Sequence, residues 1–151
     1  MATVHAPTEA DTFALGKRLG RLARAGTVVT LIGDLGAGKT VFARGVGAGL
    51  DVQSRVRSPT FILVQTHTGG RLPLWHADLY RLDDPEDLIQ LGLGELLDSE
   101  GVVIVEWGDR FPEVFGADHL QIRIDDAAVG RQITVVGTGP RSAELERQLA
   151  P

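Results

Sequence analysis

The chain has 151 residues, of which 43% are hydrophobic and 23% charged, and this composition is typical of a globular protein with one domain over residues 1–151. It contains no cysteine, which excludes disulfides, thiolate metal sites and a cysteine nucleophile. Its formal net charge of −5 argues against extensive direct contact with DNA or RNA, because affinity for nucleic acids depends on basic side chains that neutralise phosphates.

Residues 1–8 lack the basic start and apolar run of a signal peptide. No apolar stretch of the chain approaches the ~20 residues of a membrane span, so we expect a cytoplasmic protein.

The first helix is predicted to begin at Thr8. Thr8 and Asp11 have the spacing of a capping box, and helical periodicity continues to about Arg24. One face of this helix is apolar and the other is basic, which we interpret as a solvated face and not as a docking surface. The basic residues are Lys17, Arg21 and Arg24.

Residues 27–32 are almost all β-branched or apolar, which predicts a strand buried on both faces. The next eight residues, 33–40, match the phosphate-binding pattern G-x-x-x-x-G-K-[ST]. Its glycines let the backbone turn N–H groups toward a phosphate, Lys39 supplies a positive charge, and Thr40 offers a hydroxyl to Mg²⁺. A helix is predicted over residues 41–50, although three glycines there weaken that prediction. The residues of this motif expected to bind the nucleotide are Gly33, Leu35, Gly36, Ala37, Gly38, Lys39 and Thr40.

The middle of the chain predicts two strands followed by helices. Residues 61–64 and 72–76 are strand-like, and Gly69-Gly70 between them favours an antiparallel hairpin. Asp84-Pro85 is typical of a helix start, and a second short helix is expected to pass through Leu96-Leu97.

The last third of the chain predicts more strands and a final helix. Residues 102–105 are uniformly apolar, as in a buried strand. Alternation over 119–125 and 132–136 predicts a second hairpin, which we expect at an edge of the sheet, and residues 142–149 predict a terminal helix. The whole pattern indicates a single α/β domain with a mixed parallel and antiparallel sheet.

Two acidic residues follow predicted buried strands, where the carboxylates of nucleotide hydrolases commonly lie. Glu106 ends the strand 102–105, and Asp78 follows the strand 72–76. One acid is expected to hold Mg²⁺ and the other to orient the attacking water, but the residues alone do not assign the two roles.

Other polar residues have competing interpretations. Thr60, in Ser58-Pro59-Thr60-Phe61, is either part of a switch-like loop that reaches the nucleotide or part of an ordinary proline turn. His76 is interpreted as a structural strand residue, Trp107 as a core or nucleotide-packing residue, and Arg131 as a surface arginine at the tip of the last hairpin.

These motifs together resemble the TsaE (YjeE) family, the ATPase of bacterial tRNA threonylcarbamoyladenosine synthesis. The phosphate loop is generic, but its combination with later blocks in the family's order is specific, and the blocks span nearly the whole chain. The matching blocks are Thr12-x-x-Leu15-Gly16, Gly33 to Thr40, Ser58 to Phe61 with Leu63-Val64, His76 to Leu82, Asp84-Pro85-Glu86, Val105-Glu106-Trp107 and Gly130-Arg131.

The resemblance implies a three-layer P-loop NTPase domain with a mixed sheet that binds ATP and Mg²⁺. It implies Thr40 and Glu106 as metal ligands, Asp78 as the residue needed for hydrolysis, Thr60 in a switch-like position, and Trp107 and Arg131 near the nucleotide. It also implies two protein partners, TsaD and TsaB, that carry out the tRNA chemistry, so that tRNA is met only through them. Residues 108–113 match the family pattern only loosely, so no role follows for Asp109 or Arg110.

Other classes share a phosphate loop. A small-molecule or nucleoside kinase is the main alternative, and it would transfer phosphate to an acceptor other than water. A GTPase is disfavoured because the chain has no asparagine for a guanine-reading N-K-x-D segment. A nucleotide-sensing module without hydrolysis is a further alternative.

Overall fold

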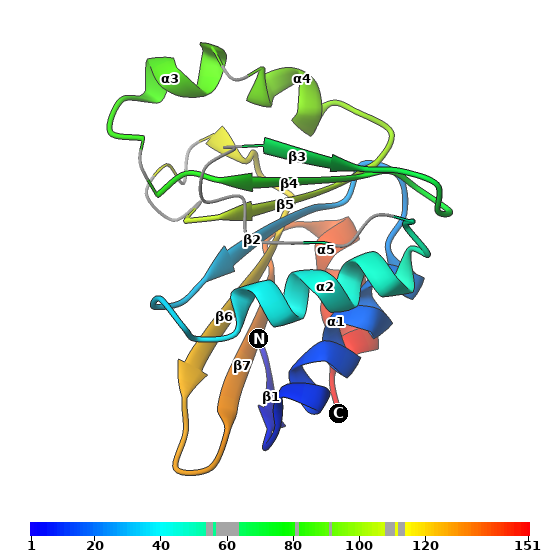
Figure 1. Cartoon of the computed structure of the whole chain (residues 1–151), viewed down its shortest axis with the longest axis vertical. Helices are drawn as coiled ribbons and strands as arrows, with labels where there is room; N and C mark the ends of the chain where they lie inside the picture. The colour runs from blue at the N-terminus through cyan, green and yellow to red at the C-terminus, as the bar shows by residue number, and fades with distance from the viewer. Residues whose placement is uncertain (54–55, 57–63, 81, 91, 108–110, 112–113) are drawn as a thin grey trace.

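The computed structural model describes residues 1–53, 56, 64–80, 82–90, 92–107, 111 and 114–151. These residues form a single α/β domain in three layers, with a seven-stranded sheet between two groups of helices (Figure 1). The strands are β1 (Ala2–Ala6), β2 (Val28–Ile32), β3 (Val64–His67), β4 (Leu74–Asp78), β5 (Val102–Glu106), β6 (Leu120–Asp126) and β7 (Arg131–Gly137). The helices are α1 (Glu9–Leu22), α2 (Lys39–Gly49), α3 (Pro85–Gln90), α4 (Leu93–Leu97) and α5 (Pro140–Leu149).

The sheet is mixed, as the sequence predicts, with strand order β1-β7-β6-β2-β5-β4-β3. Its centre is parallel, since β2 pairs in parallel with β5 and β6, and β5 pairs in parallel with β4. Helices α1, α2 and α5 pack on one face, and α3 and α4 on the other, around two separate hydrophobic clusters. Strand β5 is therefore buried along its whole length, which explains its uninterrupted apolar sequence. Among the described helices, none is long and apolar enough to cross a membrane.

Both predicted hairpins have antiparallel strands, but the second does not lie at an edge of the sheet. Strands β6 and β7 pair as expected, and β1 then pairs along the outer side of β7. The prediction of an edge hairpin is wrong because residues 2–6 form a strand. Their sequence, Ala-Thr-Val-His-Ala, is too short and too weakly apolar to indicate a strand without its partner β7. For the first hairpin, β3 begins at Val64 and pairs with β4, while residues 61–63 lie outside the described part of the chain.

Helix α1 has the predicted capping box, in which Thr8 and Asp11 bond to each other's backbone N–H. It packs on α2 so closely that the backbones touch. A methyl group on Gly16 would lie 2.2 Å from the carbonyl oxygen of Phe42, and one on Gly49 would lie 2.1 Å from the carbonyl oxygen of Lys17. Gly20 and Gly45 make equivalent contacts. Gly45 and Gly49, two of the three glycines that weaken the helix prediction for α2, are therefore needed where the two helices meet, whereas a methyl group on Gly47 would meet the side chain of Val56 at 2.7 Å.

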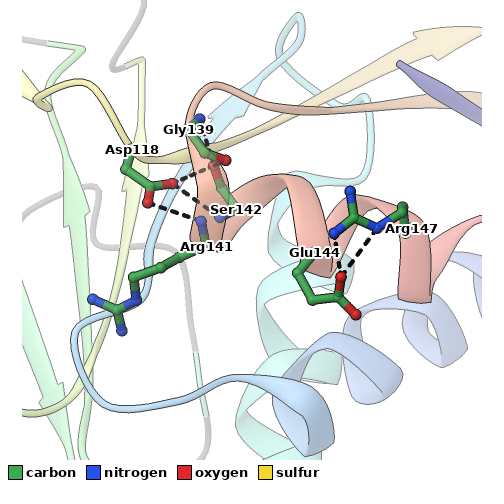
Figure 2. Close-up of polar contacts among 6 residues, drawn as sticks. All are labelled: Asp118, Gly139, Arg141, Ser142, Glu144 and Arg147. Atoms are coloured by element: carbon green, nitrogen blue, oxygen red, sulfur yellow. Dashed lines mark hydrogen bonds and ion pairs between the residues drawn. The ribbon is translucent and has the colours of Figure 1, made fainter.

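The C-terminal helix α5 is fixed to the sheet by Asp118, which precedes β6 (Figure 2). Its carboxylate accepts hydrogen bonds from the backbone N–H of Arg141 at 3.0 Å and of Ser142 at 2.9 Å, and from the Ser142 hydroxyl at 2.6 Å. Partial burial opposes ionisation of Asp118, but these hydrogen bonds and the nearby guanidinium of Arg141 hold its pKa below the ordinary value. On the exposed side of α5, Glu144 and Arg147 form an ion pair. Asp118 thus acts as the N-terminal cap that α5 lacks in its own sequence.

Candidate nucleotide site

The phosphate-binding motif forms the turn between β2 and α2, at the carboxyl end of the central strand. Gly36 and Gly38 adopt φ values of +80° and +107°, a backbone conformation that residues with a side chain rarely adopt. Gly33 has no room for a side chain, because a methyl group there would lie 2.7 Å from the carbonyl oxygen of Ile124 on β6. Gly38 is the N-cap of α2, so no capping side chain covers this helix end. The result is an open helix N-terminus suited to an anion.

Lys39 is buried at the start of α2, and among the described residues a carbonyl oxygen and an aromatic ring lie close to its ammonium group. Its Nζ donates a hydrogen bond to the carbonyl oxygen of Gly33 at 2.6 Å and lies 3.9 Å from the ring centroid of Trp107. Trp107 has a φ of 64°, which is unusual for a bulky residue, and its ring packs against Tyr80 at a centroid distance of 5.0 Å. Trp107 therefore lies beside the phosphate loop.

Asp78 and Glu106 end two neighbouring parallel strands, β4 and β5, and are register partners. Both are buried, with exposed fractions of 9% and 3%. Burial raises the pKa of Asp78; the backbone N–H of Tyr80, 2.9 Å from its Oδ1, acts in the opposite direction, and the charge of Glu106 raises the pKa further. Two acids at adjacent strand ends beside Lys39 are an arrangement for holding a divalent cation near an anion.

A cleft of about 500 Å³ joins the phosphate loop to these acids, within the usual size range of ligand pockets. It combines a lysine and a helix N-terminus, which are groups that attract phosphate, with a hydroxyl and two carboxylates, which are ligand types that suit Mg²⁺. Its lining residues are Glu9, Leu35, Gly36, Gly38, Lys39, Thr40, Val41, Asp78, Tyr80, Glu106 and Trp107. Within the described residues no cluster of three His, Cys, Asp or Glu could hold a metal by itself. A cation here would therefore need ligands from phosphate or water as well, which is how Mg²⁺ is usually bound.

Arg131 lies next to the phosphate loop instead of standing free at a hairpin tip. Its Nε donates to the carbonyl oxygen of Ala37 at 2.9 Å and its Nη2 to that of Gly36 at 3.3 Å, while Nη1 pairs with Asp126 at 3.2 Å. The interpretation of Arg131 as a plain surface arginine is wrong, because its guanidinium, although partly exposed, bonds to two carbonyl oxygens of the loop. Thr60 and the rest of the Ser58–Phe61 segment lie outside the described residues.

Comparison with known proteins identifies the family of this chain. A family model described as threonylcarbamoyl adenosine biosynthesis protein TsaE matches residues 6–133. The chain belongs to the TsaE family.

Relatives of known sequence and structure agree with this assignment. A Streptomyces coelicolor protein named tRNA threonylcarbamoyladenosine biosynthesis protein TsaE is 45% identical over 145 residues, which cover 87% of this chain and 94% of that protein. The Bacillus subtilis protein of the same name is 40% identical over 141 residues, covering 93% and 88%. A crystal structure of Bacillus subtilis YdiB superposes with a TM-score of 0.81 at 35% identity and covers 97% of this chain and 90% of that one. The fold and the family expected from the sequence are thus confirmed.

Proposed function

We propose that the cleft binds ATP together with Mg²⁺ and hydrolyses the ATP, and that the chain thereby serves proteins that modify tRNA. The observation that carries this proposal is the meeting of Lys39, Thr40 and two buried acids, Asp78 and Glu106, in one cleft at the N-terminus of α2. Cation ligands and phosphate ligands side by side fit a nucleoside triphosphate better than they fit a substrate without phosphate.

Binding of the triphosphate falls to the phosphate loop. Backbone N–H groups of residues 33–40 and the ammonium of Lys39 would hold the phosphates, with Lys39 exchanging its bond to Gly33 for one to phosphate. Thr40 and Glu106 would hold Mg²⁺ through a hydroxyl and a carboxylate oxygen. When bound, Mg²⁺ supplies positive charge to the β and γ phosphate oxygens. Trp107 and Arg131 would support the nucleotide from the two sides of the loop.

Hydrolysis would depend on Asp78, placed to orient the attacking water and accept its proton. A raised pKa makes the Asp78 carboxylate a stronger base than an exposed aspartate, which favours this role. Thr60 would complete the site from the Ser58–Phe61 segment. Among the described residues that line the cleft none is an arginine, so turnover by the chain alone should be slow, without the transition-state charge that an arginine finger supplies.

We further propose that the chain acts in the cytoplasm on TsaD and TsaB, which would perform the tRNA chemistry while ATP hydrolysis here drives their turnover. The printed names of the relatives support a place in tRNA threonylcarbamoyladenosine synthesis. The net charge of −5 agrees with contact to tRNA only through these partners.

The test is to measure phosphate release and ATP binding with and without purified TsaD and TsaB. We expect slow release alone, acceleration by the partner pair, and loss of hydrolysis with retained ATP binding in Asp78→Asn. Absence of ATP binding in the presence of Mg²⁺ would refute the proposal. Transfer of phosphate to an acceptor instead of water would establish the kinase alternative.

A further inference from the structure

His76 is a fully buried titratable residue to which the proposed mechanism gives no role. It lies on β4 two residues before Asp78, so both side chains lie on the same face of the sheet. Its Nε2 is 2.6 Å from Oε2 of Glu106, the proposed metal ligand at the end of the adjacent strand. His76 is therefore the residue that directly contacts the carboxylate expected to bind Mg²⁺.

The hydrogen bond has a defined direction. An ionised carboxylate only accepts, so Nε2 carries the hydrogen and donates it to Glu106. The other ring nitrogen, Nδ1, is buried and has no hydrogen-bond partner among the described residues, so the contact with Glu106 is made through Nε2.

The contact matters because a buried carboxylate needs a partner. Glu106 is 3% exposed, and the one hydrogen bond to its side chain from the described residues goes to Oε2. Its second oxygen, Oε1, thus remains available for a cation. Ligand carboxylates in metal sites are commonly oriented by an outer hydrogen bond of this kind, and loss of such a partner weakens metal binding about 10–100-fold.

We propose that His76 is a positioning residue for Mg²⁺: through Nε2–H it fixes one oxygen of Glu106 and leaves the other for the metal. The proposal rests on the proposed function, since it needs Glu106 as the metal ligand. It predicts that His76 affects the contribution of Mg²⁺ to nucleotide binding and leaves binding by the phosphate loop alone unchanged.

The experiment is calorimetric titration of ADP into the whole chain at several Mg²⁺ concentrations and without Mg²⁺. The matched variants are His76→Gln, whose amide nitrogen can occupy the position of Nε2, and His76→Asn, whose amide nitrogen reaches only the position of Nδ1. We expect His76→Asn to weaken the apparent Mg²⁺ affinity of the ADP complex by about 10-fold or more, with Mg²⁺-free ADP binding within about twofold of the parent chain. His76→Gln should stay within about threefold at every Mg²⁺ concentration.

Circular dichroism and thermal unfolding identify variants that fail to fold, and His76→Leu repeats the test where His76→Asn fails. Equal Mg²⁺ affinity in the Gln, Asn and parent chains would overturn the proposal. It would also be overturned if both Asn and Leu variants failed to fold, because His76 would then support only the fold. If the parent chain itself showed no effect of Mg²⁺ on ADP binding, the proposed function would fail first, and the two failures are thereby distinguished.

Discussion

The contact between α1 and α2 gives a prediction whose size follows from the structure. In Gly16→Ala, the new methyl group would lie 2.2 Å from the carbonyl oxygen of Phe42, so the helices must separate by about 1 Å to reach a normal contact. Overpacking of this kind costs typically about 1–3 kcal/mol, while the better helix propensity of alanine returns up to about 1 kcal/mol. We expect a net loss of about 1–2 kcal/mol, or roughly 2–8 °C in Tm.

The assay is urea and thermal unfolding of Gly16→Ala beside a matched control, Gly94→Ala. Gly94 is exposed in α4, and a methyl group there meets no heavy atom within 4 Å. The control should be neutral or more stable by up to about 1 kcal/mol. Because α2 carries Lys39 at its start, Gly16→Ala should also weaken ATP binding more than the control does. Equal stability of the two variants would refute the close packing of α1 on α2.

Three further predictions concern charged residues. Asp118→Ala should destabilise the chain by about 1–2 kcal/mol at pH 7 through loss of the α5 cap. Since the pKa of Asp118 is lowered by folding, this difference should decrease in urea titrations as the pH falls below about 4. Arg131→Ala should weaken ADP binding about 10-fold in calorimetry, because the carbonyls of the phosphate loop lose its hydrogen bonds, with no change in Mg²⁺ dependence. Asp78→Asn should increase the free energy of unfolding at pH 7. Folding raises the pKa of Asp78, so ionisation of this residue above about pH 4 destabilises the folded chain. Asparagine does not ionise, so the variant should not show this loss of stability at higher pH.

The parts of the site that the sequence predicts are those set by local pattern. The phosphate loop, its strand and its helix are contiguous from Val28 to Gly49, so spacing alone identifies them. The pairing of Asp78 with Glu106 follows because both residues end buried strands, and parallel strands bring their carboxyl ends to one edge of the sheet. Trp107 then follows from its position next to Glu106.

The parts that the sequence does not predict depend on contacts between distant segments. Strand β1 is defined by its partner β7, and Arg131 contacts the phosphate loop about 94 residues away along the chain. Glycines at the contact between α1 and α2 have low helix propensity, so they weaken a helix prediction made from each segment alone. Their advantage is that they let the two helix backbones approach closely, and this contact between distant segments is visible only in the structure. A signal for His76 does exist in the sequence: two residues before Asp78 on one strand, it must share the face of the site.

The charges of the cleft reduce the stability of the nucleotide-free chain but suit the binding of a divalent cation. Asp78 and Glu106 are buried in register beside each other, and burial together with the second carboxylate makes ionisation of Asp78 unfavourable. Lys39 is close enough to offset part of this cost, but its ammonium already bonds to Gly33 and lies over Trp107. A divalent cation between the acids and a phosphate would remove the remaining repulsion, so the same arrangement that destabilises the empty fold should give Mg²⁺-nucleotide binding a large stabilising effect. The stability that Asp78→Asn gains in the nucleotide-free chain should therefore shrink when Mg²⁺ and ADP are both present, and neither ligand alone should have the full effect.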